Sequence, residues 1–348
     1  MLSHKRRACG SVTQRLRSGS GFEDMKMNRN DTGSVPAVTV LLPVLNGERW
    51  IAESLESLRV QTFQDFEVLL IDDGCTDNTV AIAQSMGLAS LRVIQGPRQG
   101  VSAARALGVI SSNSQYIASQ DADDLSDPCR LEKQIKYMNA NPKCVIVGSW
   151  ARRIDENGSP IGTIKLPKDT QSIRFAMNFN CPFVNTSTFL RKDAVLAVGS
   201  YLFSSQDQFA EDYNLWSRMA RLGELHNIQE PLISYRKNSA GLTGTKGQEL
   251  RRSGCAIAIR TTEATLSRRL SDPERQLFSL SYGRHRRISV IEAFRLYRIM
   301  LRILFKFGFP PAFRGITWRA WLAPIVWIVR APQQSTHLWE NDEIPEIS

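Results

Sequence analysis

Residues 66–74 read FEVLLIDDG, a run of mostly aliphatic side chains that ends in two aspartates and a glycine. An uninterrupted apolar run of this length is typical of a strand that is buried on both faces of a parallel sheet. Val38–Leu42, which is followed by Pro43, has the same character. The two segments therefore predict strands of a mainly parallel sheet in an α/β fold.

Segments with helical spacing alternate with strand-like segments on both sides of this stretch. The predicted strands are Val38–Leu42, Phe66–Ile71, Leu91–Gln95 and Tyr116–Ser119, and the predicted helices are Trp50–Leu58, Asn78–Met86, Val101–Ile110 and Arg130–Asn139. This alternation indicates βαβ units and a Rossmann-like sheet flanked by helices. Because the crossovers are right-handed, the carboxyl ends of the strands share one edge, where open α/β sheets bind their ligands.

Acidic side chains follow two of these predicted strands directly. Asp72 and Asp73 follow one strand, and the group 121–124, which reads DADD, follows another, so both should face one crevice. Glu211 and Asp212 form a third acidic pair, ahead of an amphipathic segment. Each motif alone also has an ordinary explanation, as an exposed turn, a capping turn or the favourable acidic first turn of a helix.

The group 121–124 suits a divalent cation. Asp121 and Asp123 are two residues apart, and in an extended segment side chains at that spacing lie on the same side. Carboxylates are hard ligands that suit Mg²⁺ or Mn²⁺, and these ions also keep waters and bind phosphate oxygens. A further carboxylate can act as a general base toward a hydroxyl. The order of the three acidic motifs favours such chemistry over three unrelated turns.

Charge is distributed unevenly along the 348 residues, whose net charge is +10. Residues 1–34 carry +4, residues 284–330 carry +9 and residues 331–348 carry −4, which leaves +1 for residues 35–283. The nearly neutral body argues against a nucleic-acid partner, and the basic C-terminal region indicates an anionic one. The six cysteines form no CxxC pair and the four histidines are far apart, which favours reduced cysteines in the cytoplasm over a zinc site or a disulfide framework.

Both ends of the chain differ from the body. Residues 1–34 are polar and basic without an apolar signal segment, so we expect them to be disordered. Between residues 288 and 307 an apolar segment carries a basic stripe of Arg295, Arg298, Arg302 and Lys306, and residues 316–329 add Trp318, Trp321 and Trp327. No stretch reaches the roughly 18 uncharged apolar residues of a spanning helix. The pattern is typical of a helix on an anionic membrane surface; the alternative is that these helices pack on the body with arginines facing water.

Over about residues 37–240 the motifs resemble those of inverting glycosyltransferase family 2, which has the GT-A fold. The resemblance is carried by VTVLLPVLN at 38–46, SLESL at 54–58 with QT at 61–62, IDDGCTD at 71–77, GVSAARALG at 100–108, DADD at 121–124 with Pro128, Arg130 and Leu131, ED at 211–212 and YR at 235–236. It implies transfer of a sugar from a nucleotide diphosphate sugar to a hydroxyl group.

The resemblance also implies a nucleotide site. The segment with Pro43, Leu45 and Asn46 would line the base and ribose with backbone groups. Asp72 would accept a hydrogen bond from the pyrimidine ring, and Arg105 would lie near the nucleotide with charge-assisted contacts.

The acidic residues would then divide the remaining roles. Asp121 would contact the ribose or the metal shell, and Asp123 would bind Mn²⁺ or Mg²⁺. Asp212 would be the general base, and Glu211 would help to position the acceptor or a loop. Attack from the face opposite the leaving group inverts the anomeric centre, so no covalent glycosyl-enzyme is expected.

Several positions depart from the family pattern. Leu45 stands where tyrosine is common, so any base stacking must come from elsewhere, and Cys75 and Ala106 replace serine and asparagine. Lys237 follows Tyr-Arg in place of a hydrophobic-His sequence. Residues 248–252 read QELRR, not the QxxRW of processive synthases, so we expect transfer of single sugars.

We therefore predict a basic segment 1–34, a GT-A domain 35–240, a helical basic extension 241–331 that binds a membrane surface, and an acidic tail 332–348. Within the domain, a nucleotide-binding half at about 35–140 precedes an acceptor half at about 141–240. The expected partners are a UDP-sugar and a saccharide or lipid-linked acceptor in surface polysaccharide biosynthesis. The alternatives are a metal-dependent nucleotidyltransferase, a nucleotide-binding pseudoenzyme, or a non-enzymatic nucleic-acid-binding or membrane-scaffolding protein.

Overall fold

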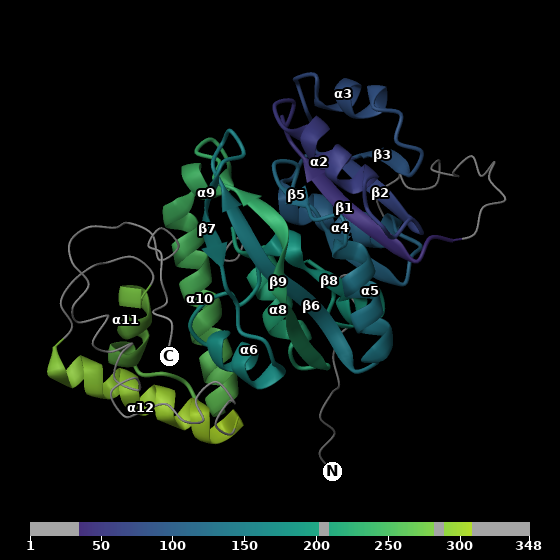
Figure 1. Cartoon of the computed structure of the whole chain (residues 1–348). Helices are drawn as coiled ribbons and strands as arrows, with labels where there is room; N and C mark the ends of the chain where they lie inside the picture. Colours follow the sequence, from purple (N-terminus) through teal and green to yellow (C-terminus); the bar gives the residue numbers. More distant parts are fainter. Residues whose placement is uncertain (1–34, 202–208, 282–288, 308–348) are drawn as a thin grey trace, which may run out of the picture. The chain divides into compact units, whose positions relative to one another are not determined.

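The computed structural model describes residues 35–201, 209–281 and 289–307. Within these ranges the chain forms a mixed α/β fold around one nine-stranded sheet (Figure 1). The strand order is β3-β2-β1-β4-β8-β6-β9-β5, with β7 beside β6. The strands are β1 (Val38–Val44), β2 (Phe66–Asp72), β3 (Leu91–Gln95), β4 (Tyr116–Ser119), β5 (Leu125–Ser126), β6 (Cys144–Ile154), β7 (Pro160–Ile164), β8 (Phe189–Arg191) and β9 (Glu224–Arg236).

The first half of the sheet is parallel throughout. β1 pairs in parallel with β2 and β4, and β2 pairs in parallel with β3. All seven residues of β1 are buried, because Leu41 faces one hydrophobic cluster while Val40 and Leu42 face a second cluster across the sheet. The helices of this half are α2 (Ile51–Arg59), α3 (Thr79–Ser85), α4 (Val101–Ser111) and α5 (Arg130–Ala140). Burial on both faces explains the continuous apolar runs, and the predicted mainly parallel, Rossmann-like sheet is confirmed here.

Close approach of α4 to the sheet depends on one glycine. A Cβ added to Gly108 would lie 2.9 Å from Leu41 Cδ2 and 3.1 Å from Ile71 Cδ1. Both distances are shorter than ordinary carbon contacts, so a larger side chain there would push α4 away from β1 and β2.

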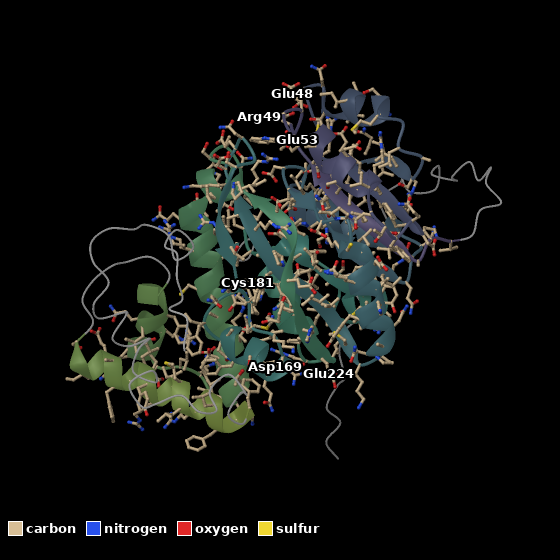
Figure 2. All side chains as sticks on the ribbon, viewed as in Figure 1. Glu48, Arg49, Glu53, Asp169, Cys181 and Glu224 are labelled. Carbon is tan, nitrogen blue, oxygen red and sulfur yellow. The ribbon has the colours of Figure 1, made fainter. Side chains whose placement is uncertain are left out.

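The second half of the sheet mixes strand directions. β8 is antiparallel to β4 and β6, whereas β6 and β9 run parallel. Its short helices are α6 (Thr170–Ala176), the 3₁₀ turn η1 (Asn185–Ser187), α7 (Lys192–Ala197) and α8 (Glu211–Met219). β9 begins at Glu224 and ends at Arg236, whose Nη2 donates to Glu53 Oε2 at 2.7 Å. Glu53 and Glu224 are labelled at opposite ends of the fold in Figure 2, so β9 carries its last residues to the edge where β1 ends.

The predicted C-terminal helical extension is present. It contains α9 (Leu242–Thr245), α10 (Gly247–Leu266), α11 (Asp272–Ser281) and α12 (Val290–Phe307). α10 contributes consecutive residues to two separate cores: Ile257 packs in the cluster that includes Trp216 of α8, and Ala258 packs in the cluster that includes Ile303 of α12. Figure 1 shows α12 crossing one end of α10.

The other predictions for the chain ends have different outcomes. One face of α12 packs on the body and its four basic residues are exposed, as the packing alternative expects. None of the helices in the described ranges is both long enough and apolar enough to cross a bilayer. The predicted disorder at 1–34, the tryptophans at 316–329 and the acidic tail 332–348 lie outside the described residues.

Candidate functional site

The loops that follow β1 and β2 are joined by hydrogen bonds at the edge of the sheet. Asn46, in a left-handed conformation at φ 55°, accepts at Oδ1 from the Thr76 N–H at 2.8 Å, and the Gly47 N–H donates to Thr79 Oγ1 at 2.8 Å. Asparagine tolerates this conformation better than most residues. Pro43 is buried in β1, whereas Leu45 is 59% exposed. The predicted nucleotide segment therefore presents its backbone and Leu45 beside the end of β2.

Asp72, at the end of β2, is buried and ionised. Its Oδ1 accepts from the backbone N–H groups of Cys75 and Gly74 at 2.7 and 3.1 Å, and its Oδ2 accepts from Gln95 Nε2 at 3.0 Å. Burial alone would raise the pKa of Asp72, but these donors favour the charged form and lower the pKa below its ordinary 3.8. The carboxylate stays negative at neutral pH and lies at the sheet edge, beside the loops that follow β1 and β2.

Asp73 has a structural role. Its carboxylate accepts from the Arg98 and Gly100 backbone N–H groups at 2.7 and 2.8 Å. These bonds fix the loop that leads into α4, and α4 carries Arg105.

Arg105 connects two acidic motifs that are far apart in the sequence. Its side chain is buried, its Nη2 lies 2.8 Å from Asp121 Oδ1, and its Nη1 forms an ion pair with Glu211 Oε1. Burial would lower the pKa of Arg105, but Asp121 and Glu211 raise it, so the guanidinium stays charged. Arg105 lies between the two carboxylates and holds them at one site; its predicted place near the nucleotide stays a prediction.

Two residues of η1 that carry no sequence signal fix the group 121–124. Asn185 Nδ2 donates to Asp121 Oδ1 at 3.1 Å. Thr186 Oγ1 lies 2.9 Å from Asp121 Oδ2 and 2.6 Å from Asp124 Oδ2. Burial, together with Asp123 and Asp121, raises the pKa of Asp124 well above 3.8. Asp124 is thus a buried structural carboxyl, whereas Asp121 remains partly exposed.

Asp123 is held by the last residue of β9 and by Asn238, which follows the strand. Its Oδ2 accepts from Asn238 Nδ2 at 2.9 Å, and its backbone carbonyl accepts from Arg236 Nε at 2.9 Å. Burial raises the pKa of Asp123; Asn238 opposes this shift and Asp121 adds to it. Asn238 was missed by sequence reasoning, although the departure from the family pattern after Arg236 pointed to this segment.

Asp121 and Asp123 fit a divalent cation that takes part of its ligand shell from other molecules. Both side chains are partly exposed, and the negative Asp121 disfavours ionisation of Asp123, a repulsion that a cation would relieve. The described part of the chain has no group of three or more histidine, cysteine or acidic side chains placed to hold a metal. Two carboxylates suit Mg²⁺ or Mn²⁺, which keep waters and bind phosphate oxygens, better than an ion enclosed by protein.

Glu211 and Asp212 form the first turn of α8. Glu211 is 4% exposed, and burial, opposed by Arg105 but assisted by Asp212, raises its pKa to about 7. Asp212 is partly exposed and its Oδ1 accepts the Tyr213 N–H at 2.6 Å. Burial, again opposed by Arg105, raises the pKa of Asp212 above 3.8. The nearby Cys181 thiol stays protonated, because burial, Asp212 and Glu211 raise its pKa well above 9.0.

With Asp212 as the base, the acid limb of the pH–rate profile should therefore lie at a higher pH than the ordinary pKa of an aspartate predicts. The rate is highest above the raised pKa and falls as the pH drops through it. The charge on Asp212 raises the pKa of Glu211, so Glu211 gains its proton first as the pH falls, and Glu211→Gln should leave the acid limb of kcat in place. A kcat–pH profile of both proteins tests this, and an acid limb that moves to lower pH in Glu211→Gln would show that the charge of Glu211 acts on Asp212.

Arg130, part of the predicted motif, is fully buried and stabilises the acidic loop through hydrogen bonds. It is 0% exposed, and its guanidinium donates to Gln120 Oε1 and Ser126 Oγ at 2.9 Å each and to the Ser119 carbonyl at 2.7 Å. Burial lowers its pKa to about 9, and Asp124 opposes this shift.

Arg130→Met should therefore lower the free energy of unfolding by about 3 kcal/mol, because it leaves several buried acceptors without donors. Urea unfolding measures the loss. Lys133→Met on the same helix is the control: Lys133 forms an exposed pair with Glu230, so its loss should cost less than about 1 kcal/mol. Equal effects of the two substitutions would show that the buried network contributes little.

Comparison with known proteins gives consistent matches. Residues 39–199 match the model of the family described as Glycosyl transferase family 2. An uncharacterized glycosyltransferase of Haemophilus influenzae is 31% identical over 217 residues, which are 58% of this chain and 65% of that protein, just under two thirds. The putative glycosyltransferase EpsE of Bacillus subtilis is 32% identical, and the match covers 59% of this chain and 75% of EpsE. The amylovoran biosynthesis glycosyltransferase AmsE of Erwinia amylovora is 29% identical, and the match covers 60% of this chain and 79% of AmsE.

Solved structures share the fold. S. aureus TarS 1–349 in complex with UDP-GlcNAc has a TM-score of 0.54 at 16% identity and covers 84% of this chain and 87% of its own. The mannosyltransferase PcManGT from Pyrobaculum calidifontis, in complex with GDP-Man and Mn²⁺, has a TM-score of 0.50 at 16% identity, with 87% and 83% covered. The predicted GT-A fold is confirmed.

Proposed function

Because this chain belongs to glycosyl transferase family 2, we propose that it moves a single sugar, with inversion, from a UDP-sugar to a hydroxyl of a saccharide or lipid-linked saccharide. The observation that carries the proposal is the bridge that Arg105 makes between Asp121 and Glu211. Asp121 is the carboxylate that we place beside the diphosphate, and Glu211 belongs to the acidic pair of α8 that contains the proposed base. The bridge therefore brings the leaving group and the base to one reaction centre.

The nucleotide binds at the sheet edge, against the loops after β1 and β2. Asp72 Oδ2, which accepts one hydrogen bond from Gln95, accepts a second from the uracil ring. Backbone groups of Pro43, Leu45 and Asn46 line the base and ribose, and exposed Leu45 gives apolar contact where the family often has tyrosine. Asp121 lies between this nucleotide and the rest of the site.

The leaving diphosphate would lie beside Asp121 and Asp123, the two residues that would hold Mn²⁺ or Mg²⁺. When bound, the ion neutralises the negative charge that develops on the diphosphate. Asn238 donates to Asp123 Oδ2 and keeps the carboxylate oriented. Asn185 and Thr186 do the same for Asp121, which makes the site rigid before the substrate binds.

Asp212 takes the proton of the acceptor hydroxyl. The hydroxyl oxygen then bonds to the anomeric carbon as the bond to the diphosphate breaks, and attack from the opposite face inverts the centre. Asp212 is the more exposed member of the acidic pair, as a base that meets an acceptor must be. Glu211 is buried against Arg105 and positions the first turn of α8.

The relatives support a role in polysaccharide biosynthesis. AmsE is named for the biosynthesis of amylovoran, and by analogy we assign this chain to surface polysaccharide assembly. We place this work on the cytoplasmic side of the membrane as part of the same proposal. Transfer of one sugar at a time fits the absence of a QxxRW sequence.

The test is a panel of UDP-sugars, with GDP-mannose for comparison, assayed for nucleoside diphosphate release with saccharide and lipid-linked acceptors in Mn²⁺. The expected result is transfer from one UDP-sugar to a defined hydroxyl, with a product of inverted anomeric configuration by NMR. Retained configuration would contradict the single displacement. Release of pyrophosphate from a nucleoside triphosphate, without transfer, would favour a nucleotidyltransferase instead.

A further inference from the structure

One side of α12 combines bulky apolar and basic side chains, and both kinds are exposed. Ile291, Phe294 and Phe305 are 66%, 61% and 73% exposed. The residues that we call the α12 outer face are Ile291, Phe294, Arg295, Arg298, Arg302, Phe305 and Lys306, all of them exposed. Their spacing of three or four residues places them on one side of the helix.

The opposite side of α12 fixes this orientation. Ile299, Ile303 and Leu304 are at most 1% exposed and share a core with Phe175 of α6 and Phe278 of α11. Burying the outer face by rotating α12 would expose these core side chains instead. Because the other side of α12 is already packed, the outer face stays exposed in the folded chain.

In the part of the chain that the structure describes, the positive charge of the outer face has few acidic neighbours. Among the described residues, Arg295, Arg298, Arg302 and Lys306 have no ion pair, and Glu292 is the one acid of α12. Glu292 lies in the first turn and accepts from Ser289 Oγ at 2.9 Å.

A shallow hollow adjoins the C-terminal end of the outer face. It is lined by Leu266, Arg268, Arg302, Phe305 and Lys306. Arg268 is engaged by Glu274 at 2.7 Å, which leaves Arg302 and Lys306 to meet an anion there. An anionic group with an apolar part attached would match this combination of cations, a leucine and a phenylalanine.

We propose that the α12 outer face rests on the surface of an anionic phospholipid bilayer. Phe294, Phe305 and Ile291 enter the boundary between headgroups and acyl chains, and the arginines contact lipid phosphates. A basic helix with large aromatic residues on the same side gains from both contacts. A purely acidic protein partner would satisfy the arginines but leave the phenylalanines in water.

The sequence that follows α12 strengthens the choice of a membrane. Residues 308–330 contain Arg314, Arg319 and Arg330, no acidic residue, and three tryptophans. Residues 308–330 therefore supply no acidic side chain to the outer face. The competing source within the chain is the segment 331–348, which carries four acidic residues and no lysine or arginine.

The test uses the full chain in vesicle co-sedimentation, with phosphatidylcholine alone and with added phosphatidylglycerol. We expect binding only to the anionic vesicles, weakened by salt. Arg298→Glu with Arg302→Glu should lower the bilayer partition coefficient at least about tenfold, since each basic residue near the surface contributes about a fivefold effect. Phe294→Ser with Phe305→Ser should lower it by a comparable factor even in low salt.

The matched control is Lys133→Glu with Lys136→Glu, which makes the same charge change on α5, away from α12 and outside the catalytic site. This variant should bind vesicles like the unaltered chain, and all variants should keep the thermal shift given by UDP and Mn²⁺. That shift tests the nucleotide site separately, so the two proposals can fail independently.

Two outcomes would overturn the proposal. One is equal loss of binding in the α5 and α12 charge variants, which would mean diffuse electrostatic attraction. The other is an unaltered chain that binds no vesicles until Glu340, Asp342, Glu343 and Glu346 are replaced by their amides, which would assign the outer face to the acidic segment 331–348.

Discussion

Replacing Asp212 with asparagine is expected to lower kcat for sugar transfer about 10²- to 10⁴-fold, the usual contribution of a general base. The amide cannot take the acceptor's proton, but its oxygen can still accept the Tyr213 N–H that the carboxylate accepts at 2.6 Å. The start of α8 should therefore keep its conformation. Steady-state kinetics at several donor concentrations should show the loss in kcat with little change in KM for the donor.

Glu211→Gln is the matched comparison for this experiment. Glu211 is the neighbouring carboxylate, buried against Arg105. Its amide keeps the shape and can still accept from Arg105, so a smaller loss is expected, with the acid limb of kcat in place as described above. If Glu211→Gln abolishes transfer while Asp212→Asn retains it, the two roles are reversed. Full activity in both variants would exclude a base at this turn.

Replacing Asp123 with asparagine is the second change with a large expected effect. It removes one of the two carboxylates that fit the cation, so transfer should fall about 10²- to 10³-fold, as is typical for loss of charge stabilisation in a transition state. UDP with Mn²⁺ should raise the melting temperature of the unaltered chain more than UDP with EDTA does, because a ligand that binds only the folded state stabilises it. In Asp123→Asn this difference should disappear, while the shift given by UDP alone remains.

Asp124→Asn separates cation binding from loop structure. Asp124 is buried, accepts the Arg236 N–H at 2.8 Å and accepts from Thr186 at 2.6 Å. Its amide loses one of these acceptors, so we expect a lower melting temperature but a preserved Mn²⁺-dependent shift. A full Mn²⁺-dependent shift in Asp123→Asn would place the cation elsewhere.

The parallel half of the fold could be predicted closely from the sequence. Leu91–Gln95 and Tyr116–Ser119 have the predicted bounds, and β1 and β2 extend at most two residues further. For β1, β2 and β4 the reason is physical: strands buried on both faces need unbroken apolar runs. Local sequence therefore contains most of the information that this half requires.

The other half depends on contacts between distant residues. β9 reads ELHNIQEPLISYR, in which buried and exposed positions alternate irregularly because the register with β6 shifts twice near Trp150. α10 contains many polar and small residues, and its buried face becomes evident only when α8, α11 and α12 surround it. No window of the sequence shows these elements clearly.

The candidate site shows the same division. Its carboxylates were predicted from their positions after strands, but the residues that orient them were not. Asn185, Thr186 and Asn238 contact Asp121 and Asp123 across 64 to 115 positions of the chain. The position of Arg105 between two carboxylates likewise follows from the packing of α4 against the sheet and could not be read from its motif.

The consecutive residues Ile257 and Ala258 of α10, each in a different core, have a consequence for the choice of acceptor. They join the helix that carries Asp212 and the helix proposed to touch lipid into one stiff unit. With α12 lying on a bilayer, the proton-accepting group would be held at a constant height above the headgroups. The growing end of a lipid-linked glycan that is too short or too long would then not reach Asp212. The enzyme would therefore select acceptors by their length.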